Sequence, residues 1–256
     1  MNLTFYKYQG TGNDFVMIDN RAEIFPKENT DMISHITDRH FGVGADGIIL
    51  IENDENFDFK MIYFNADGSQ TFCGNGARCA VAFAKKLDII KDKTTFLAFD
   101  GTHFAEIEKG VISLQMTDVT EIQVGENSVF MNTGTQHHVE VVADLTDYPV
   151  FEHGKKIRNS YQDPGSNVNF VQQIDAATFR VRTYEKGVED ETLACGTGVT
   201  AVAIAMHKTN KTKSNLVSLQ VEGGVLDVSF TEEKGTYKNV SLKGLAKFVF
   251  KGNILI

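Results

Sequence analysis

The segments Cys73-Gly74-Asn75-Gly76 and Cys195-Gly196-Thr197-Gly198 repeat one design, and this repeat decides the expected fold. In each segment, a cysteine and two glycines precede a run of small apolar residues that is typical of a buried helix. A cysteine at a helix N-terminus lies at the positive end of the helix dipole, which stabilises its thiolate. Glycines at that position would let a carboxylate approach the backbone N–H groups. The repeat therefore predicts two similar halves that each contribute one reactive thiol.

The composition predicts a globular chain. Of its 256 residues, 42% are hydrophobic and 23% are charged, which leaves enough apolar side chains for two cores. A net charge of -9 with no basic run would repel a phosphate backbone, so we expect no nucleic-acid partner. The sequence shows no signal-like start and no apolar stretch long enough to span a bilayer. We therefore expect a cytoplasmic protein without membrane contact.

The chain has three cysteines. An odd number in a chain of this length favours reduced thiols over a disulfide framework. No CxxC pair is present, so we expect no metal. Cys79 falls inside the first predicted buried helix, where a thiol behaves as a small hydrophobe. Cys73 or Cys195 alone could equally be a packing thiol at a helix start, but their matching glycine flanks favour a functional pair.

Alternating apolar and polar residues predict that strands dominate both halves. In the first half we expect strands at residues 57–64 and 95–99, a short helix from 29 or 30 to about 39, and a helix at 77–87. After residue 118 the pattern starts again, with strands at 139–142, 167–171 and 178–184, a helix at 199–207, strands at 217–221 and 225–230 around a turn at Gly223-Gly224, and a last strand at 248–256.

The helix expected at residues 77–87 has little polar face. A helix that is apolar nearly all round must be buried, so we expect strands to wrap around it. The predicted fold class is α+β, with two pseudo-symmetric halves that are each a β-barrel-like mixed sheet around a central helix. The expected N-terminal half, 1–120, carries Cys73, and the C-terminal half, 121–249, carries Cys195. We expect a C-terminal strand, 250–256, to return to the N-terminal half.

Two other motifs carry weaker signals. The segment Gly42-Val43-Gly44-Ala45-Asp46-Gly47 matches GxGxxG but precedes a strand at 48–51, whereas a dinucleotide site follows a strand and opens a helix. Its glycines are better explained by a turn. His137 and His138 are adjacent, and neighbouring side chains on a strand point to opposite faces, so at most one of them can enter a given site. The residues alone do not decide between them.

Four segments together resemble the diaminopimelate epimerases: GTGNDF at 10–15, NADGSQTFCGNGAR at 65–78, NVNF at 167–170 and YEKGVEDETLACGTG at 184–198. The resemblance covers essentially the full length and implies the two-half fold described above. It also implies an isomerase that converts LL- to meso-diaminopimelate, in lysine and peptidoglycan precursor synthesis. By the same resemblance we expect no pyridoxal phosphate or other cofactor, a small-molecule substrate and a homodimer.

The resemblance also assigns site residues. It implies that Cys73 and Cys195 flank the substrate's α-carbon as catalytic acid and base, and that His137 and Glu185 tune their pKa values. The residues that would contact the substrate through side chains or backbone amides are Asn13, Asn65, Gly74, Asn75, Asn169, Glu185, Lys186, Gly196 and Thr197.

Several positions depart from the commoner family pattern, mainly around substrate recognition. Lys186 replaces an arginine, so a point charge stands in place of a planar bidentate fork. Thr135-Gln136 replaces Asn-Pro, Gly47 replaces a glutamine of some members, and Phe250 replaces a tyrosine found at the family's dimer interface. These departures leave open a racemase of another amino acid. A less favoured alternative is a redox couple formed by the two thiols. Another is a cysteine hydrolase that uses Cys195 and a histidine, which would leave the second cysteine unexplained.

Overall fold

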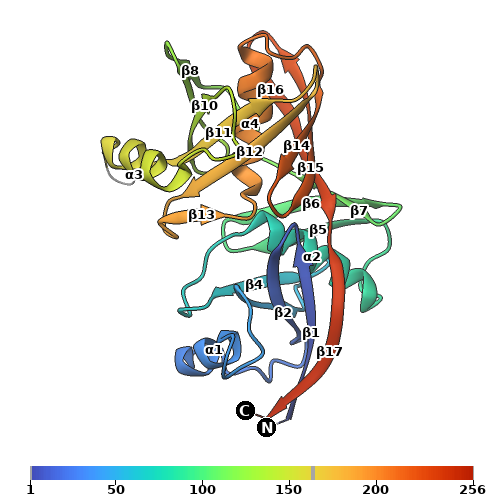
Figure 1. Cartoon of the computed structure of the whole chain (residues 1–256). Helices are drawn as coiled ribbons and strands as arrows, with labels where there is room; N and C mark the ends of the chain where they lie inside the picture. Colours follow the sequence, from blue (N-terminus) through green and yellow to red (C-terminus); the bar gives the residue numbers. More distant parts are fainter. Residues whose placement is uncertain (1, 163–164, 256) are drawn as a thin grey trace. The chain divides into compact units, whose positions relative to one another are not determined.

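The computed structural model describes residues 2–162 and 165–255. The chain divides into two units, Met1–Leu114 with Gly244–Ile256, and Gln115–Lys243. Figure 1 labels the helices and most of the strands of both units. Each unit is a mixed sheet that packs against one long helix, which confirms the predicted fold class of two repeated halves.

The sheet of the first unit contains antiparallel and parallel pairs. Strand β17 pairs antiparallel with β1 and β1 with β2; β2 is parallel to β3; β3 is antiparallel to β4; β4 is parallel to β5; β5, β6 and β7 are antiparallel neighbours. The strands are β1 (Asn2–Gly10), β2 (Asn13–Asp19), β3 (Gly47–Glu52), β4 (Lys60–Asn65), β5 (Lys93–Ala98), β6 (Gly101–Glu108), β7 (Val111–Gln115) and β17 (Lys247–Leu255). Helix α1 (Thr30–Thr37) connects β2 to β3, and α2 (Gly74–Lys86) connects β4 to β5.

The second unit has the same sequence of strand directions. Strands β8, β9 and β10 are antiparallel neighbours; β10 is parallel to β11; β11 is antiparallel to β12; β12 is parallel to β14; β14, β15 and β16 are antiparallel. The strands are β8 (Ile122–Val124), β9 (Ser128–Asn132), β10 (Gln136–Val141), β11 (Asn167–Gln173), β12 (Thr178–Glu185), β13 (Asp190–Thr192), β14 (Leu216–Val221), β15 (Gly224–Glu233) and β16 (Thr236–Leu245). Helices α3 (Val150–Ser160) and α4 (Gly196–Lys208) make the two parallel connections, as α1 and α2 do in the first unit.

The two long helices are the buried centres of their units. Helix α2 packs against β1 to β4, and α4 against strands from β9 to β15. Nearly all residues of α4 are buried, most of them alanine, valine or isoleucine. Burying such side chains stabilises each unit by about 25 cal/mol for every Å² of apolar surface removed from water. Both helices end in basic residues, Lys85-Lys86 and His207-Lys208, which suit the negative end of a helix dipole.

The structure corrects three sequence-based expectations. Helices α2 and α4 begin about three residues earlier than predicted, because the glycines after each cysteine form the first helical turn. Helix α1 ends at Thr37 rather than near residue 39, although Asn29 caps it as expected. Helix α3 was not predicted. Only Val150 and Gly154 of α3 are buried, so its sequence lacks the apolar repeat by which helices are recognised.

Candidate active site

Cys73 is the residue immediately before helix α2. Its backbone is extended, with φ -130° and ψ 116°, and its carbonyl accepts the first helical hydrogen bond from Ala77 N at 2.8 Å. The first backbone N–H groups of an α-helix have no acceptor within the helix, so they point toward this end. The half-buried thiol therefore lies where a helix favours negative charge.

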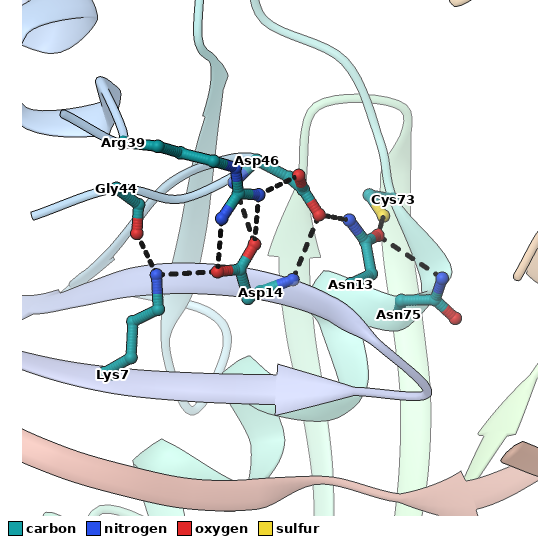
Figure 2. Close-up of polar contacts among 8 residues, drawn as sticks. All are labelled: Lys7, Asn13, Asp14, Arg39, Gly44, Asp46, Cys73 and Asn75. Carbon is teal, nitrogen blue, oxygen red and sulfur yellow. Dashed lines mark hydrogen bonds and ion pairs between the residues drawn. The ribbon is translucent and has the colours of Figure 1, made fainter. Parts of the chain in front are cut away.

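Asn13 lies between Cys73 and Asn75 and hydrogen-bonds to both (Figure 2). The Cys73 thiol donates to Asn13 Oδ1 at 3.4 Å, and Asn75 Nδ2 donates to the same oxygen at 3.3 Å. The other end of the Asn13 amide, Nδ2, donates to the carboxylate of Asp46. Three residues that the sequence predicts for the site, Asn13, Cys73 and Asn75, thus form one hydrogen-bonded group.

An ion-pair cluster of Lys7, Asp14, Arg39 and Asp46 lies beside that group (Figure 2). Arg39 donates to Asp14 Oδ1 at 2.8 Å and to Asp46 Oδ1 at 2.7 Å, and Lys7 lies 2.8 Å from Asp14 Oδ2. Burial raises the pKa of Asp14, but hydrogen bonds from Arg39 and Lys7 outweigh it and lower that pKa to about 2. Asp14 therefore stays ionised at neutral pH.

Sequence reasoning missed this ion-pair cluster. Asp46 lies within the GxGxxG match, which the sequence identifies only as a turn. The partners of Asp46 come from β2 and from the loop after α1, so no local pattern links them. The neighbouring Gly47 is tightly enclosed, because a Cβ there would lie 2.3 Å from the backbone oxygen of Phe64. A glutamine at position 47 does not fit this backbone.

Cys79 behaves as the sequence predicts. It is fully buried within α2, and burial raises the pKa of its thiol well above the ordinary value. A thiol in that environment packs as a small apolar group and is protonated at neutral pH. The expectation that Cys79 is a packing residue is confirmed.

Cys195 occupies the matching position in the second unit. Its backbone is extended, with φ -118° and ψ 111°, and its carbonyl accepts from Val199 N at 3.0 Å. Its sulfur lies 3.5 Å from the Thr197 hydroxyl. A Cβ on Gly198 would lie 2.4 Å from Asn169 Oδ1 and 3.3 Å from the Cys195 sulfur. Position 198 therefore requires glycine, because Asn169 and Cys195 both approach the helix there.

Asn169 links the Cys195 region to His137. Asn169 is fully buried. Its Nδ2 lies 2.9 Å from the His138 carbonyl and 3.2 Å from His137 Nδ1. Its Oδ1 accepts a hydrogen bond from the Thr183 hydroxyl at 3.0 Å. Because the Asn169 amide donates to His137 Nδ1, the neutral imidazole carries its proton on Nε2. Within residues 2–162 and 165–255, that Nε2 has no hydrogen-bond partner. It is a buried donor that a bound molecule could use.

The two adjacent histidines have different surroundings. His138 Nδ1 lies 2.8 Å from the Tyr161 hydroxyl, and His138 Nε2 lies 3.6 Å from Glu140. Burial lowers the pKa of His138. Burial, together with a smaller effect of the Lys186 charge, lowers the pKa of His137 from its ordinary 6.5 to about 3. His137 is therefore neutral at pH 7 and lies beside Asn169.

The low pKa of His137 predicts a pH-dependent stability. Between about pH 6 and 4 the unfolded chain binds a proton at this residue and the folded chain does not, so folding becomes less favourable as the pH falls. The unfolding free energy should lose about 1.4 kcal/mol per pH unit from this group. Urea unfolding of the wild type and of His137→Gln over this range measures the difference. Equal slopes for the two proteins would contradict the assignment.

Three other predicted residues make their hydrogen bonds to residues outside these two groups. Glu185 ends β12; burial raises the pKa of its carboxyl, partly offset by the Thr192 hydroxyl, which donates to Oε2 at 2.9 Å. The Lys186 backbone N donates to Asn167 Oδ1 at 2.9 Å. Asn65 Nδ2 donates within its own turn, to the hydroxyls of Ser69 at 2.9 Å and Thr71 at 3.2 Å.

Among the residues that the structure describes, none of the helices combines the length and the apolar character needed to cross a membrane. Nor do three or more histidine, cysteine or acidic side chains from this part of the chain gather in a way that could hold a metal ion.

The family model and the full-length relatives that match this chain carry the same family name. The family model described as diaminopimelate epimerase matches residues 5–126 and again 129–249, once for each half. The chain is 57% identical to the diaminopimelate epimerase of Flavobacterium psychrophilum over 98% of this chain and all of that protein. It is 42% identical to that of Aquifex aeolicus, with 98% of each chain covered.

Solved structures share the fold at low sequence identity. A phenazine biosynthesis protein of the PhzF family from Bacillus anthracis matches with a TM-score of 0.80 at 13% identity, over the whole of both chains. A probable proline racemase from Agrobacterium radiobacter K84 matches with a TM-score of 0.70 at 14% identity, over 99% of this chain and 93% of that one. Because the family model matches both halves and full-length relatives are 42% to 57% identical, the chain belongs to the diaminopimelate epimerase family.

Proposed function

We propose that this isomerase converts LL-2,6-diaminopimelate to meso-diaminopimelate without a cofactor, with Cys73 and Cys195 as its acid and base. The 57% identity to a full-length relative of that name supports the substrate. One observation carries the proposed mechanism: each unit places a cysteine directly before its buried central helix, at the same point in the same strand pattern. Two independent packing thiols would not require such a match.

In the proposed reaction, one cysteine acts as thiolate and the other as thiol. The thiolate takes the α-proton, and the electron pair of the broken C–H bond is delocalised into the α-carboxylate. The second thiol then gives its proton to the opposite face of the carbon, which inverts it. The two sulfur atoms thereby exchange protonation states. Because the pair titrates together, a pH–rate profile belongs to both thiols rather than to one.

Backbone N–H groups supply the stabilisation that the carbanion needs. Negative charge grows on the α-carboxylate as the proton leaves, and preorganised donors that face this charge lower the barrier. We assign this role to the amides of Gly74, Asn75, Gly196 and Thr197, which lie in the first turns of α2 and α4. The N-termini of both helices favour an anion through the helix dipole.

The side chains proposed to contact the substrate are Asn13, Asn65, Asn169, Glu185 and Lys186. His137 and Glu185 are proposed to tune the thiols. Since His137 is buried and neutral, it would act through its Nε2 proton and not through a positive charge. We further propose a cytoplasmic homodimer that binds neither nucleic acid nor membranes, in lysine and peptidoglycan precursor synthesis.

Lys186 favours a second candidate function, the racemisation of a different amino acid by the same two thiols. An arginine would hold a distal carboxylate through two parallel hydrogen bonds, whereas lysine offers a single charged nitrogen. Initial rates with LL-diaminopimelate and with monocarboxylic L-amino acids decide between the candidates. We expect diaminopimelate to have the highest kcat/KM. Faster racemisation of a monocarboxylic amino acid would overturn the substrate assignment and leave the two-thiol chemistry in place.

A further inference from the structure

The orientation of the Asn13 side chain determines which hydrogen bond Cys73 can make. An amide has a donor end, NH2, and an acceptor end, the oxygen, and the two ends exchange when the group turns by 180°. Here the oxygen faces Cys73 and accepts from its thiol at 3.4 Å. In the turned orientation the NH2 group would face the sulfur and favour a thiolate. The fold must therefore select one orientation for the acid–base behaviour of Cys73 to be defined.

Charged groups at both ends of a chain of amides make this selection. Asp46 is a carboxylate and can only accept, so it binds the NH2 group of Asn13. Arg78 is a guanidinium and can only donate; its Nη2 lies 3.0 Å from Asn75 Oδ1. Asn75 must then turn its own Nδ2 toward Asn13 Oδ1, at 3.3 Å. The order Asp46, Asn13, Asn75, Arg78 permits one direction of hydrogen bonding.

Asp46 is itself fixed by the ion-pair cluster (Figure 2). Arg39 holds its Oδ1 at 2.7 Å, and the backbone N–H of Asp14 donates to its Oδ2 at 3.1 Å. The Oδ2 atom is the one that faces Asn13. Arg39 also binds Asp14, which pairs with the buried Lys7. The acceptor is thus anchored to β2 by the Asp14 backbone N–H, and through Arg39 and Asp14 to Lys7 of β1.

We propose that Asp46 is a positioning residue, which holds the oxygen of the Asn13 amide against the Cys73 thiol. This inference rests on the proposed function, in which Cys73 must present a proton in one direction of the reaction. A hydrogen bond from S–H to the Asn13 oxygen exists only in the protonated state, so it stabilises the acid form. It also directs the proton along one line.

Two variants at position 46 separate orientation from charge. Asp46→Ala and Asp46→Asn both remove the negative charge, but only asparagine keeps an oxygen that can accept from Asn13. Arg39, whose side chain is 56% exposed, can turn into solvent to accommodate the asparagine NH2 group. The Asp46 side chain is itself 38% exposed, so alanine leaves no buried cavity. Asp46→Ser, whose hydroxyl is too short to reach Asn13, serves as a second loss-of-acceptor variant if Asp46→Ala does not fold.

The first readout is the kinetics of epimerisation of LL-diaminopimelate. Loss of one orienting hydrogen bond should lower the kcat of Asp46→Ala about tenfold. KM should rise by a smaller factor, because Asn75 still holds the amide of Asn13, which is proposed to contact the substrate. Asp46→Asn should retain a kcat close to that of the wild type. A purely structural role for Asp46 would instead lower the urea midpoint and leave kcat unchanged in the folded fraction.

The second readout does not depend on epimerase activity. In a Cys195→Ala background, the pH dependence of Cys73 alkylation by iodoacetamide, followed by mass spectrometry, gives the pKa of its thiol. We expect this pKa to be about one unit lower in Asp46→Ala than in the Asp46→Asn variant. Equal pKa values in the two variants would show that the orientation of the Asn13 amide does not affect the Cys73 thiol, and would overturn the proposal. If the wild type does not epimerise diaminopimelate, the proposed function fails, and the alkylation still tests the orientation.

Discussion

Replacing either Cys73 or Cys195 with alanine is expected to lower the kcat for epimerisation by roughly 10²- to 10⁴-fold, which is the range for removal of a general acid or base. Inversion requires one group that takes the proton and another that returns it on the opposite face, so each single variant should lose activity. Chiral chromatography of the product formed from LL-diaminopimelate measures the effect. The pH dependence of the rate that comes from titration of the two thiols should also disappear in both variants.

The third cysteine supplies a matched control for these variants. Cys79 lies within helix α2, which begins directly after Cys73, but it is fully buried and packs as an apolar group. Cys79→Ser should therefore retain most of the activity of the wild type, with some loss of stability from the buried hydroxyl. Full activity in Cys73→Ala or Cys195→Ala would contradict the assignment of roles. Loss of activity in Cys79→Ser, with an unchanged urea midpoint, would give Cys79 a role that its burial argues against.

Asn169→Ala is expected to destabilise the second unit by about 3 kcal/mol or more, because each buried polar group left without a partner costs roughly 1–3 kcal/mol. The substitution removes hydrogen bonds to the His137 ring, the His138 carbonyl and the Thr183 hydroxyl, all of them in buried residues. Urea unfolding followed by far-ultraviolet circular dichroism measures the loss.

Asn65→Ala is the matched control, since sequence resemblance gives both asparagines the same role. The contacts of Asn65 lie in an exposed turn, at Ser69 and Thr71. The loss there should stay near 1 kcal/mol, because exposed partners that lose Asn65 can hydrogen-bond to water instead. A stability loss in Asn169→Ala no larger than that in Asn65→Ala would contradict the buried hydrogen-bond arrangement.

The repeated halves were predictable because their signal is local. Cysteine, glycines and a small apolar run stand next to one another in the sequence, and alternating strands flank them. The starts of α2 and α4 were misplaced because glycine is usually a poor helix residue, whereas close approaches such as that of Asn169 to Gly198 require it inside the first turn. Helix α3 escaped prediction because its face toward the sheet buries little beyond Val150 and Gly154.

Only those site residues that belong to a sequence motif could be predicted. The residues beside each cysteine followed from the resemblance, but the choice between His137 and His138 depends on which face of β10 meets Asn169. Asp46 binds Asn13, 33 positions away, and Arg39, 7 positions away in the loop after α1, and nothing in the sequence around Asp46 distinguishes it from an ordinary turn residue. Charged groups that act through a neighbouring amide leave no motif of their own.

The two-thiol chemistry is tested most directly by isotope distribution during early turnover in deuterium oxide. LL-diaminopimelate is incubated with the enzyme, and the reaction is stopped while most of the substrate remains. Two opposed thiols predict deuterium at the inverted carbon of the meso product and unexchanged protium at that carbon in the recovered substrate. A meso product that keeps the original proton would show that a single group both removes and returns it, and would contradict the roles assigned to Cys73 and Cys195.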